Sequence, residues 1–114
     1  MFDFQKLEVY RKAMHFCKSV SALLHSEIID KVTRDQLRRA SFSIMLNIAE
    51  GSSRFSNKDR KNFLVIARGS AFECAAIMDY LAEMKELTQE EYNHYVNSLD
   101  ELSRMLFGLI RRLE

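Results

Sequence analysis

The sequence predicts an all-α protein, an up-down-up-down four-helix bundle. Its 114 residues contain no proline and only three glycines, whereas strand-rich folds need many turns that usually use both residues. Apolar residues recur at intervals of three and four along four segments, which is the spacing of one helix face. A chain of this length makes one domain, so residues 1–114 are expected to form a single unit. The expected helices are residues 4–25, 34–51, 57–85 and 89–113.

The first predicted helix, residues 4–25, has an apolar face and a polar face. Such a helix buries one side against the rest of a bundle. The apolar stripe contains Leu7, Tyr10, Met14, Cys17, Ser21 and Leu24, and is widened by Ala13, Phe16, Val20 and Leu23.

The second predicted helix, residues 34–51, has two apolar stripes. Thr33 and Gln36 have the spacing of a capping box that would start it, and Gly51 suits the left-handed residue that ends many helices. One stripe is expected to face the bundle core, and the other needs a second subunit or a ligand. This surplus predicts self-association. The first stripe is Leu37, Ala40, Ile44, Ile48 and Gly51, and the second is Phe42, Met45 and Ala49, with Leu46 between them.

The third and fourth predicted helices have clear start signals. Ser56 with Asp59 suits the start of residues 57–85, and Thr88 with Glu91 forms a capping box for residues 89–113. The third helix is apolar over more than half of its circumference, and its small residues would allow a neighbouring helix to approach closely. The fourth helix has one apolar seam: Tyr92, Tyr95, Leu99, Leu102, Leu106, Leu109 and Leu113.

The charge is unevenly distributed although the net charge is only +1. Residues 34–68 hold eight Lys or Arg and three acids, whereas residues 73–101 hold eight acids and one Lys. Such asymmetry is typical of a surface that binds a polyanion, although basic and acidic surfaces could instead meet within or between subunits. An aromatic residue, Phe55, lies among the basic residues of the second turn and could stack on a base. The expected nucleic-acid-binding residues are Arg38, Arg39, Arg54, Lys58, Arg60 and Lys61; the alternative is a solvated turn.

No motif predicts an enzyme, a cofactor or a metal site. The chain lacks the glycine-rich loops that bind nucleotides. Glu91 and His94 have the spacing of a di-iron bundle motif, but such a site needs a second copy and two more glutamates. His15 and His25 have no partner at metal-ligand spacing. We therefore expect a protein that is not an enzyme.

The chain contains no apolar run of the roughly 20 residues that cross a bilayer, and its start does not resemble a signal peptide. Cys17 and Cys74 lie in apolar helical surroundings. We expect them to be free buried thiols in a reducing cytoplasm, with a disulfide or redox role as the alternative.

Five polar residues interrupt the apolar runs of the two central helices: Asn47, Glu50, Arg68, Ser70 and Glu73. If they are buried, Glu and Arg must be paired, because an isolated buried charge is costly. They are expected to form a polar network that fixes helix register or subunit contacts. A ligand or nucleic-acid site is the alternative.

Three blocks of sequence carry a family resemblance: FQKLEVYRKA, QLRRASFSIMLNIAEGSSR and FLVIARGSAFE. They resemble the four-helix bundle proteins encoded within intervening sequences of bacterial 23S ribosomal RNA genes. The residues that match the family motif are Asn47, Glu50, Gly51, Arg68, Gly69, Ser70 and Glu73. Met45 stands where family members usually have proline, the residue that would kink this helix.

The resemblance implies a left-handed bundle that assembles as a ring-like homopentamer and has no enzymatic activity. Relatives include the accessory variability determinant of diversity-generating retroelements, which binds nucleic acid and a reverse transcriptase. The expected function is therefore binding of nucleic acid, RNA rather than DNA, through the basic surface. The alternative is a scaffold that docks a partner protein, such as a reverse transcriptase, without contacting nucleic acid.

Overall fold

The computed structural model describes residues 1–114 and contains helices without strands. A short 3-10 turn, η1 (Asp3–Lys6), precedes α1 (Glu8–Ser19) and the single-turn α2 (Ser21–Leu24), which together make the first arm of the bundle. The other three arms are α3 (Lys31–Ser52), α4 (Asn57–Glu83) and α5 (Gln89–Arg112).

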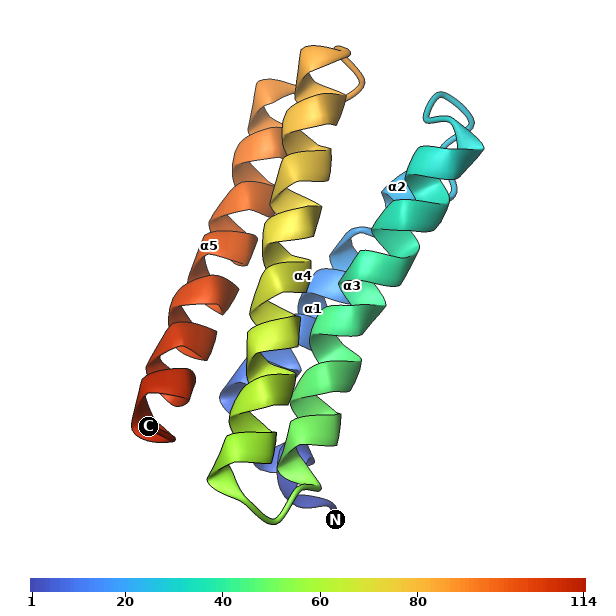
Figure 1. Cartoon of the computed structure of the whole chain (residues 1–114). Coiled ribbons are helices and arrows are strands. Elements are labelled where there is room, and N and C mark those ends of the chain that lie inside the picture. The colour runs from blue at the N-terminus through green and yellow to red at the C-terminus, as the bar shows by residue number, and fades with distance from the viewer.

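Successive arms run in opposite directions along a body of 44 × 23 × 21 Å (Figure 1). Helix α3 packs on α1 and α4, and α5 packs on α4 and α1, so the order around the bundle is α1, α3, α4, α5. The all-α four-helix prediction is confirmed. No helix combines the length and the apolar character that crossing a membrane would require.

The prediction of one continuous helix over residues 4–25 is wrong. Leu7 has an extended backbone, and the segment before it folds so that Phe4 packs edge-on against Tyr10, with ring centroids 4.8 Å apart. Further along, the hydroxyls of Ser19 and Ser21 donate to the carbonyls of Phe16 and Lys18 at 2.8 and 2.7 Å. Such bonds compete with the helical hydrogen-bond pattern, and the regular helix ends near them.

The buried stripe of this first arm also differs from the expected one. The residues in the core are Val9, Ala13, Phe16, Val20 and Leu23. Leu7, Tyr10 and Leu24 are only partly buried, and Met14 is exposed. The residues expected merely to widen the stripe are therefore its centre.

Both ends of α3 differ from the sequence prediction. Asp30, not Thr33, is the N-cap, because its carboxylate accepts the backbone N–H and the hydroxyl of Thr33, each at 2.9 Å. These two hydrogen bonds favour the charged carboxylate and lower the pKa of Asp30. Helix α3 is unbroken at Met45 and continues through Gly51 to Ser52.

Gly51 is therefore not the left-handed end of a helix, and no glycine in the chain has positive φ. It is buried where α3 and α4 converge. A Cβ at this position would lie 3.1 Å from Cβ of Phe63 and 3.3 Å from the carbonyl oxygen of Arg60. Gly51 thus permits a close approach of the two helices.

The starts of α4 and α5 agree with the sequence. The hydroxyl of Ser56 accepts the N–H of Asp59 at 3.1 Å. Thr88 and Glu91 form the expected capping box, with reciprocal bonds of 2.9 and 3.1 Å. Helix α4 ends at Glu83 rather than residue 85.

The end of α4 uses a left-handed residue that is not glycine. Lys85 has a φ of 59°, and the N–H of Glu86 donates to the carbonyl of Leu81 at 2.8 Å. This hydrogen bond is typical of a Schellman end, which turns the chain sharply into α5.

The core runs the length of the bundle, but α3 and α4 keep apolar side chains outside it. The first stripe of α3 is buried, whereas Phe42 of the second stripe and Leu46, which lies between the two stripes, are 45% and 58% exposed. Helix α4 exposes Val65, Ile66 and Phe72 to a similar degree. The surplus apolar surface predicted for the two central helices is therefore present.

Candidate nucleic-acid interface

Basic side chains from three parts of the chain meet at one end of the bundle. The turn between α3 and α4 lies there, together with both chain termini (Figure 1). The ammonium of Lys61, near the start of α4, lies 3.4 Å from the carboxylate of Glu114. This ion pair places the end of α5, with Arg111 and Arg112, at the same end of the bundle as the start of α4. Arg111 pairs with the same carboxylate at 3.6 Å. We call the group the basic end: Arg54, Lys58, Arg60, Lys61, Arg111 and Arg112.

Arg111 and Arg112 were not among the expected binding residues, because more than 50 residues separate them from the turn in sequence. The topology of the predicted bundle could have identified them. In an up-down-up-down bundle, the second turn and the C-terminus lie at the same end.

Phe55 projects from the tip of the turn and is 99% exposed. Burying a Phe side chain stabilises a folded protein by about 1.5 to 3 kcal/mol, and the ring of Phe55 contributes none of this stabilisation within the chain. Its neighbours in sequence are Arg54 and Ser56, and Lys58 follows in the first turn of α4. An exposed aromatic ring therefore stands among cations.

The turn is held in place by two of its own arginines. The guanidinium of Arg54 lies 3.4 Å from the carboxylate of Glu50 and 4.6 Å from the ring centroid of Phe63. Nε of Arg60 donates to the carbonyl of Arg54 at 2.7 Å. Lys58 makes no ion pair and is exposed. Arg54 and Arg60 thus support the turn, Lys61 is partly buried and paired with Glu114, and Lys58 presents its charge to solvent.

Arg38 and Arg39 do not belong to this surface. They lie on the outer face of α3, beside Phe42 and Leu46. Arg38 is 16 residues from Arg54 in sequence, or about 24 Å along a helix. The prediction that Arg38 and Arg39 act with the turn rested on the net charge of the segment alone.

Of the five polar residues that were expected to form a network, only Asn47 and Ser70 take part in one. Glu50 and Glu73 are exposed. The network that exists is uncharged: Ser70 Oγ donates to Ser43 Oγ at 2.7 Å, and Asn47 Nδ2 donates to the hydroxyl and carbonyl of Ser43 at 3.0 and 2.8 Å. It joins α3 to α4, and its central member, Ser43, was missed because an isolated serine gives no sequence signal.

Arg68 is held by aromatic rings rather than by a carboxylate. Its guanidinium lies 4.7 Å from the ring centroid of Phe72 and 5.5 Å from that of Phe107. Its Nε is buried without a hydrogen-bond partner. Cation–π contacts of this kind stabilise a partly desolvated guanidinium.

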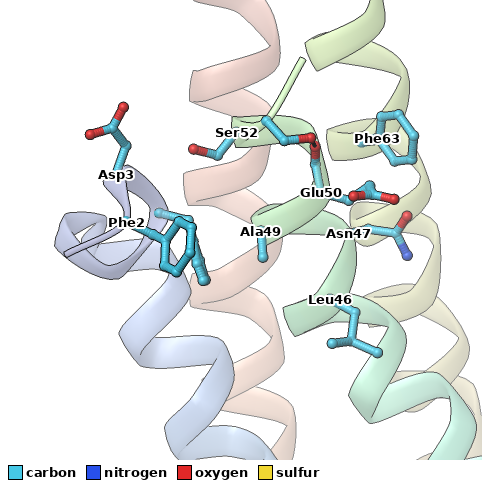
Figure 2. A pocket seen from close by; sticks show the side chains of 10 residues that line it. Phe2, Asp3, Leu46, Asn47, Ala49, Glu50, Ser52 and Phe63 are labelled. Atoms are coloured by element: carbon cyan, nitrogen blue, oxygen red, sulfur yellow. Dashed lines mark hydrogen bonds between the residues drawn. The ribbon is translucent and has the colours of Figure 1, made fainter.

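An open groove of about 630 Å³ adjoins the basic end (Figure 2). It crosses the last turns of α3, with Phe2 on one side and Phe63 on the other. Asn47 and Glu50 line it, so two residues of the family motif are accessible from solvent.

The residues considered for metal binding are not arranged for it. The carboxylate of Glu91 accepts the N–H of Thr88 within the capping box. The ring of His94 packs edge-on against Tyr95, with centroids 5.4 Å apart. No group of three or more His, Cys, Asp or Glu side chains could hold a metal ion.

Cys17 and Cys74 are free thiols. Burial raises the pKa of Cys17 to about 11 and that of Cys74 to about 12, from an ordinary value of 9.0. Since the thiolate is the reactive form, we expect both to react slowly with a thiol reagent at neutral pH and rapidly after denaturation.

The same pKa shifts predict alkaline instability. The unfolded chain releases its thiol protons near pH 9 and the folded chain only near pH 11 to 12, so the free energy of unfolding falls across this interval. Urea titrations at pH 8 and pH 11 should show a smaller loss for a Cys17→Ala/Cys74→Ala variant than for the wild type. An equal loss in both proteins would contradict the prediction.

Comparison with known proteins agrees with this architecture. The sequence profile of the 23S rRNA-intervening sequence protein family matches residues 5–108. The crystal structure of a protein of unknown function from the S23 ribosomal protein family of Bacteroides thetaiotaomicron is similar, with a TM-score of 0.86 and 28% identity. The match covers 90% of this chain and 97% of that one. None of the curated proteins matches the chain. Because the profile spans nearly the whole sequence, the chain belongs to the 23S rRNA-intervening sequence protein family.

Proposed function

We propose that this protein is a non-enzymatic, self-associating bundle that binds RNA through its basic end. The observation that carries the proposal is the presence of six Lys and Arg residues at the end of the bundle from which the exposed ring of Phe55 projects. Cations bind the phosphate backbone and release its counterions. An exposed aromatic ring can stack on an unpaired base.

The family's name, which refers to intervening sequences of 23S rRNA, favours RNA over DNA. Self-association is supported by the exposed apolar side chains of α3 and α4. The expected assembly is a ring of five left-handed bundles in the cytoplasm, where free thiols persist. In such a ring all basic ends would lie on one rim and act together on one RNA.

RNA binding can be tested by fluorescence anisotropy with a labelled single-stranded RNA between about 50 and 200 mM salt. The wild type should bind more weakly as salt increases. A Lys58→Ala/Lys61→Ala variant should lose about tenfold or more in affinity at low salt, and the slope of log K against log salt should become shallower by about 1.4, the value for two phosphate contacts.

The matched control removes the same charge elsewhere. Lys18 and Lys31 are exposed and lie towards the other end of the bundle, so a Lys18→Ala/Lys31→Ala variant should bind like the wild type. Affinity that is independent of salt, or equal losses in both variants, would overturn the proposal.

The aromatic groove of Figure 2 favours a second candidate function, docking of a partner protein. Three Phe side chains and Leu46 give it an apolar lining. If this is the function, a specific partner should be retained from nuclease-treated lysate and lost on Phe2→Asp, while the anisotropy assay shows no RNA binding.

A further inference from the structure

We propose that the outer face of α3 in one copy of the chain seats in the groove between α4 and α5 of a second copy, in a head-to-tail contact. The inference rests on the self-association included in the proposed function, but not on RNA binding. It assigns Arg38 and Arg39 to assembly rather than to nucleic acid.

The first surface is the α3 ridge, defined as Arg38, Arg39, Phe42 and Leu46. These residues surround a shallow depression on the outside of the helix. Phe42 and Leu46 are one turn apart, and each is about half exposed. The ridge is therefore a pair of apolar knobs with two cations at one end.

The second surface is the α4–α5 groove, a hollow of about 170 Å³ with mostly apolar walls. A cavity of about 150 Å³ can hold benzene, so the groove has room for a Phe ring. Its lining residues are Ala71, Phe72, Ala75, Val96, Leu99, Asp100 and Ser103. Alanines at the centre make the hollow, and Phe72 forms one wall.

Two hydrogen bonds show that the ridge and the groove lie at the same height along the bundle. The Ser43–Ser70 bond places Phe42 level with Ala71, because α3 and α4 are antiparallel. The bond of 2.6 Å from Tyr92 Oη to Asp79 Oδ1 likewise places Ala71 level with Asp100. Copies related by rotation about an axis parallel to their bundles keep equal heights, so Phe42 of one copy faces the groove of the next.

Charge favours the same pairing. Arg38 and Arg39 lie one turn from Phe42, and the groove has Asp100 in its lining with the exposed Glu73 nearby on α4. Asp100 already pairs with Arg104 of its own chain at 3.1 Å, but remains more than half exposed. If two ridges packed on each other, their four arginines would come close together. If two grooves packed on each other, their carboxylates would do the same. Like charges in contact disfavour both symmetric alternatives.

A contact between two different surfaces makes a specific prediction for mixtures. Repeated head to tail, it closes into a ring or extends as a filament. A copy with a damaged ridge keeps its groove, and a copy with a filled groove keeps its ridge. Together these two variants have one intact contact, so they should stop at a heterodimer.

The experiment uses light scattering after size exclusion on the full chain. The wild type should have the mass of an assembly of three or more chains, each of 13.4 kDa. Phe42→Asp, which damages the ridge, and Ser103→Trp, which fills the groove, should each be monomeric. Their equimolar mixture should give a species of two chains and nothing larger. Circular dichroism must show the helical content of the wild type in both variants, and Phe42→Ala replaces Phe42→Asp if it does not.

Ile28→Asp is the matched control, because Ile28 is an apolar residue that is 78% exposed away from both surfaces, and it should assemble like the wild type. Variants that assemble like the wild type, or a mixture that stays monomeric, would overturn the head-to-tail contact while leaving self-association intact. A monomeric wild type would overturn both. RNA binding is measured separately with the lysine variants. A result that overturns RNA binding leaves this subunit contact unaffected.

Discussion

Replacing Phe16 with alanine should lower the free energy of unfolding by about 3 to 5 kcal/mol, the usual cost of deleting a buried Phe ring. Phe16 is 2% exposed and packs edge-on against Tyr95, with ring centroids 6.5 Å apart. Tyr95 in turn donates its hydroxyl to the carbonyl of Ser19 at 3.1 Å. The pair ties α1 to α5, where the bundle closes, and a domain with a total stability of about 5 to 15 kcal/mol would lose much of it.

Urea or guanidinium titration followed by circular dichroism measures the effect, and Phe55→Ala provides the control. Phe55 is 99% exposed, so its replacement should change stability by less than about 0.5 kcal/mol. Similar losses at the two positions would contradict the assignment of the core.

Replacing Gly51 with valine should destabilise the chain by about 1 to 3 kcal/mol through overpacking. A Cβ there already meets Cβ of Phe63 at 3.1 Å and the carbonyl of Arg60 at 3.3 Å. The branched side chain of valine would add two methyl groups and force α3 and α4 apart. Because Arg54 packs on Phe63 at this point, the basic turn should also be displaced and RNA affinity reduced.

Gly69 provides the contrast, because it is a second glycine of the family motif and a Cβ at this position would meet no atoms within 4 Å. Gly69→Ala should raise stability by about 0.5 to 1 kcal/mol, since glycine is unfavourable inside a helix. Denaturant titration of both variants tests the pair. A Gly51→Val variant as stable as the wild type would show that α3 and α4 do not converge at Gly51.

The sequence was most informative where local chemistry determines the structure. Ser56 and Thr88 start helices as predicted, because a hydroxyl and a nearby carboxylate satisfy backbone N–H groups whatever the tertiary context. The buried stripe of α3 was also predictable, since it follows helical periodicity. The all-α fold follows from these local signals.

Predictions failed where local signals competed. Thr33 and Asp30 are both good N-caps, and only the structure shows that Asp30 caps α3. Val20 lies within an uninterrupted apolar pattern, yet the helix ends there because neighbouring serines bond to carbonyls. Gly51 has two common uses, helix termination and close packing, and sequence spacing does not distinguish them.

The candidate site was partly predictable. The basic turn with Phe55 at its tip could be identified from composition along the chain. The contribution of Arg111 depends on how α5 returns to the same end, and the exclusion of Arg38 depends on its height along α3. The net charge of a sequence segment indicates neither the path of α5 nor the height of a residue along α3.

The position of both termini at the basic end (Figure 1) has a practical consequence for handling the protein. An affinity tag or fluorescent reporter fused at residue 1 or 114 would lie at the basic end, and one fused at residue 114 would lie beside Lys61, whose ammonium contacts Glu114. Labels and surface attachment points are better placed at the opposite end, in the connection between α4 and α5, where they leave the basic end open.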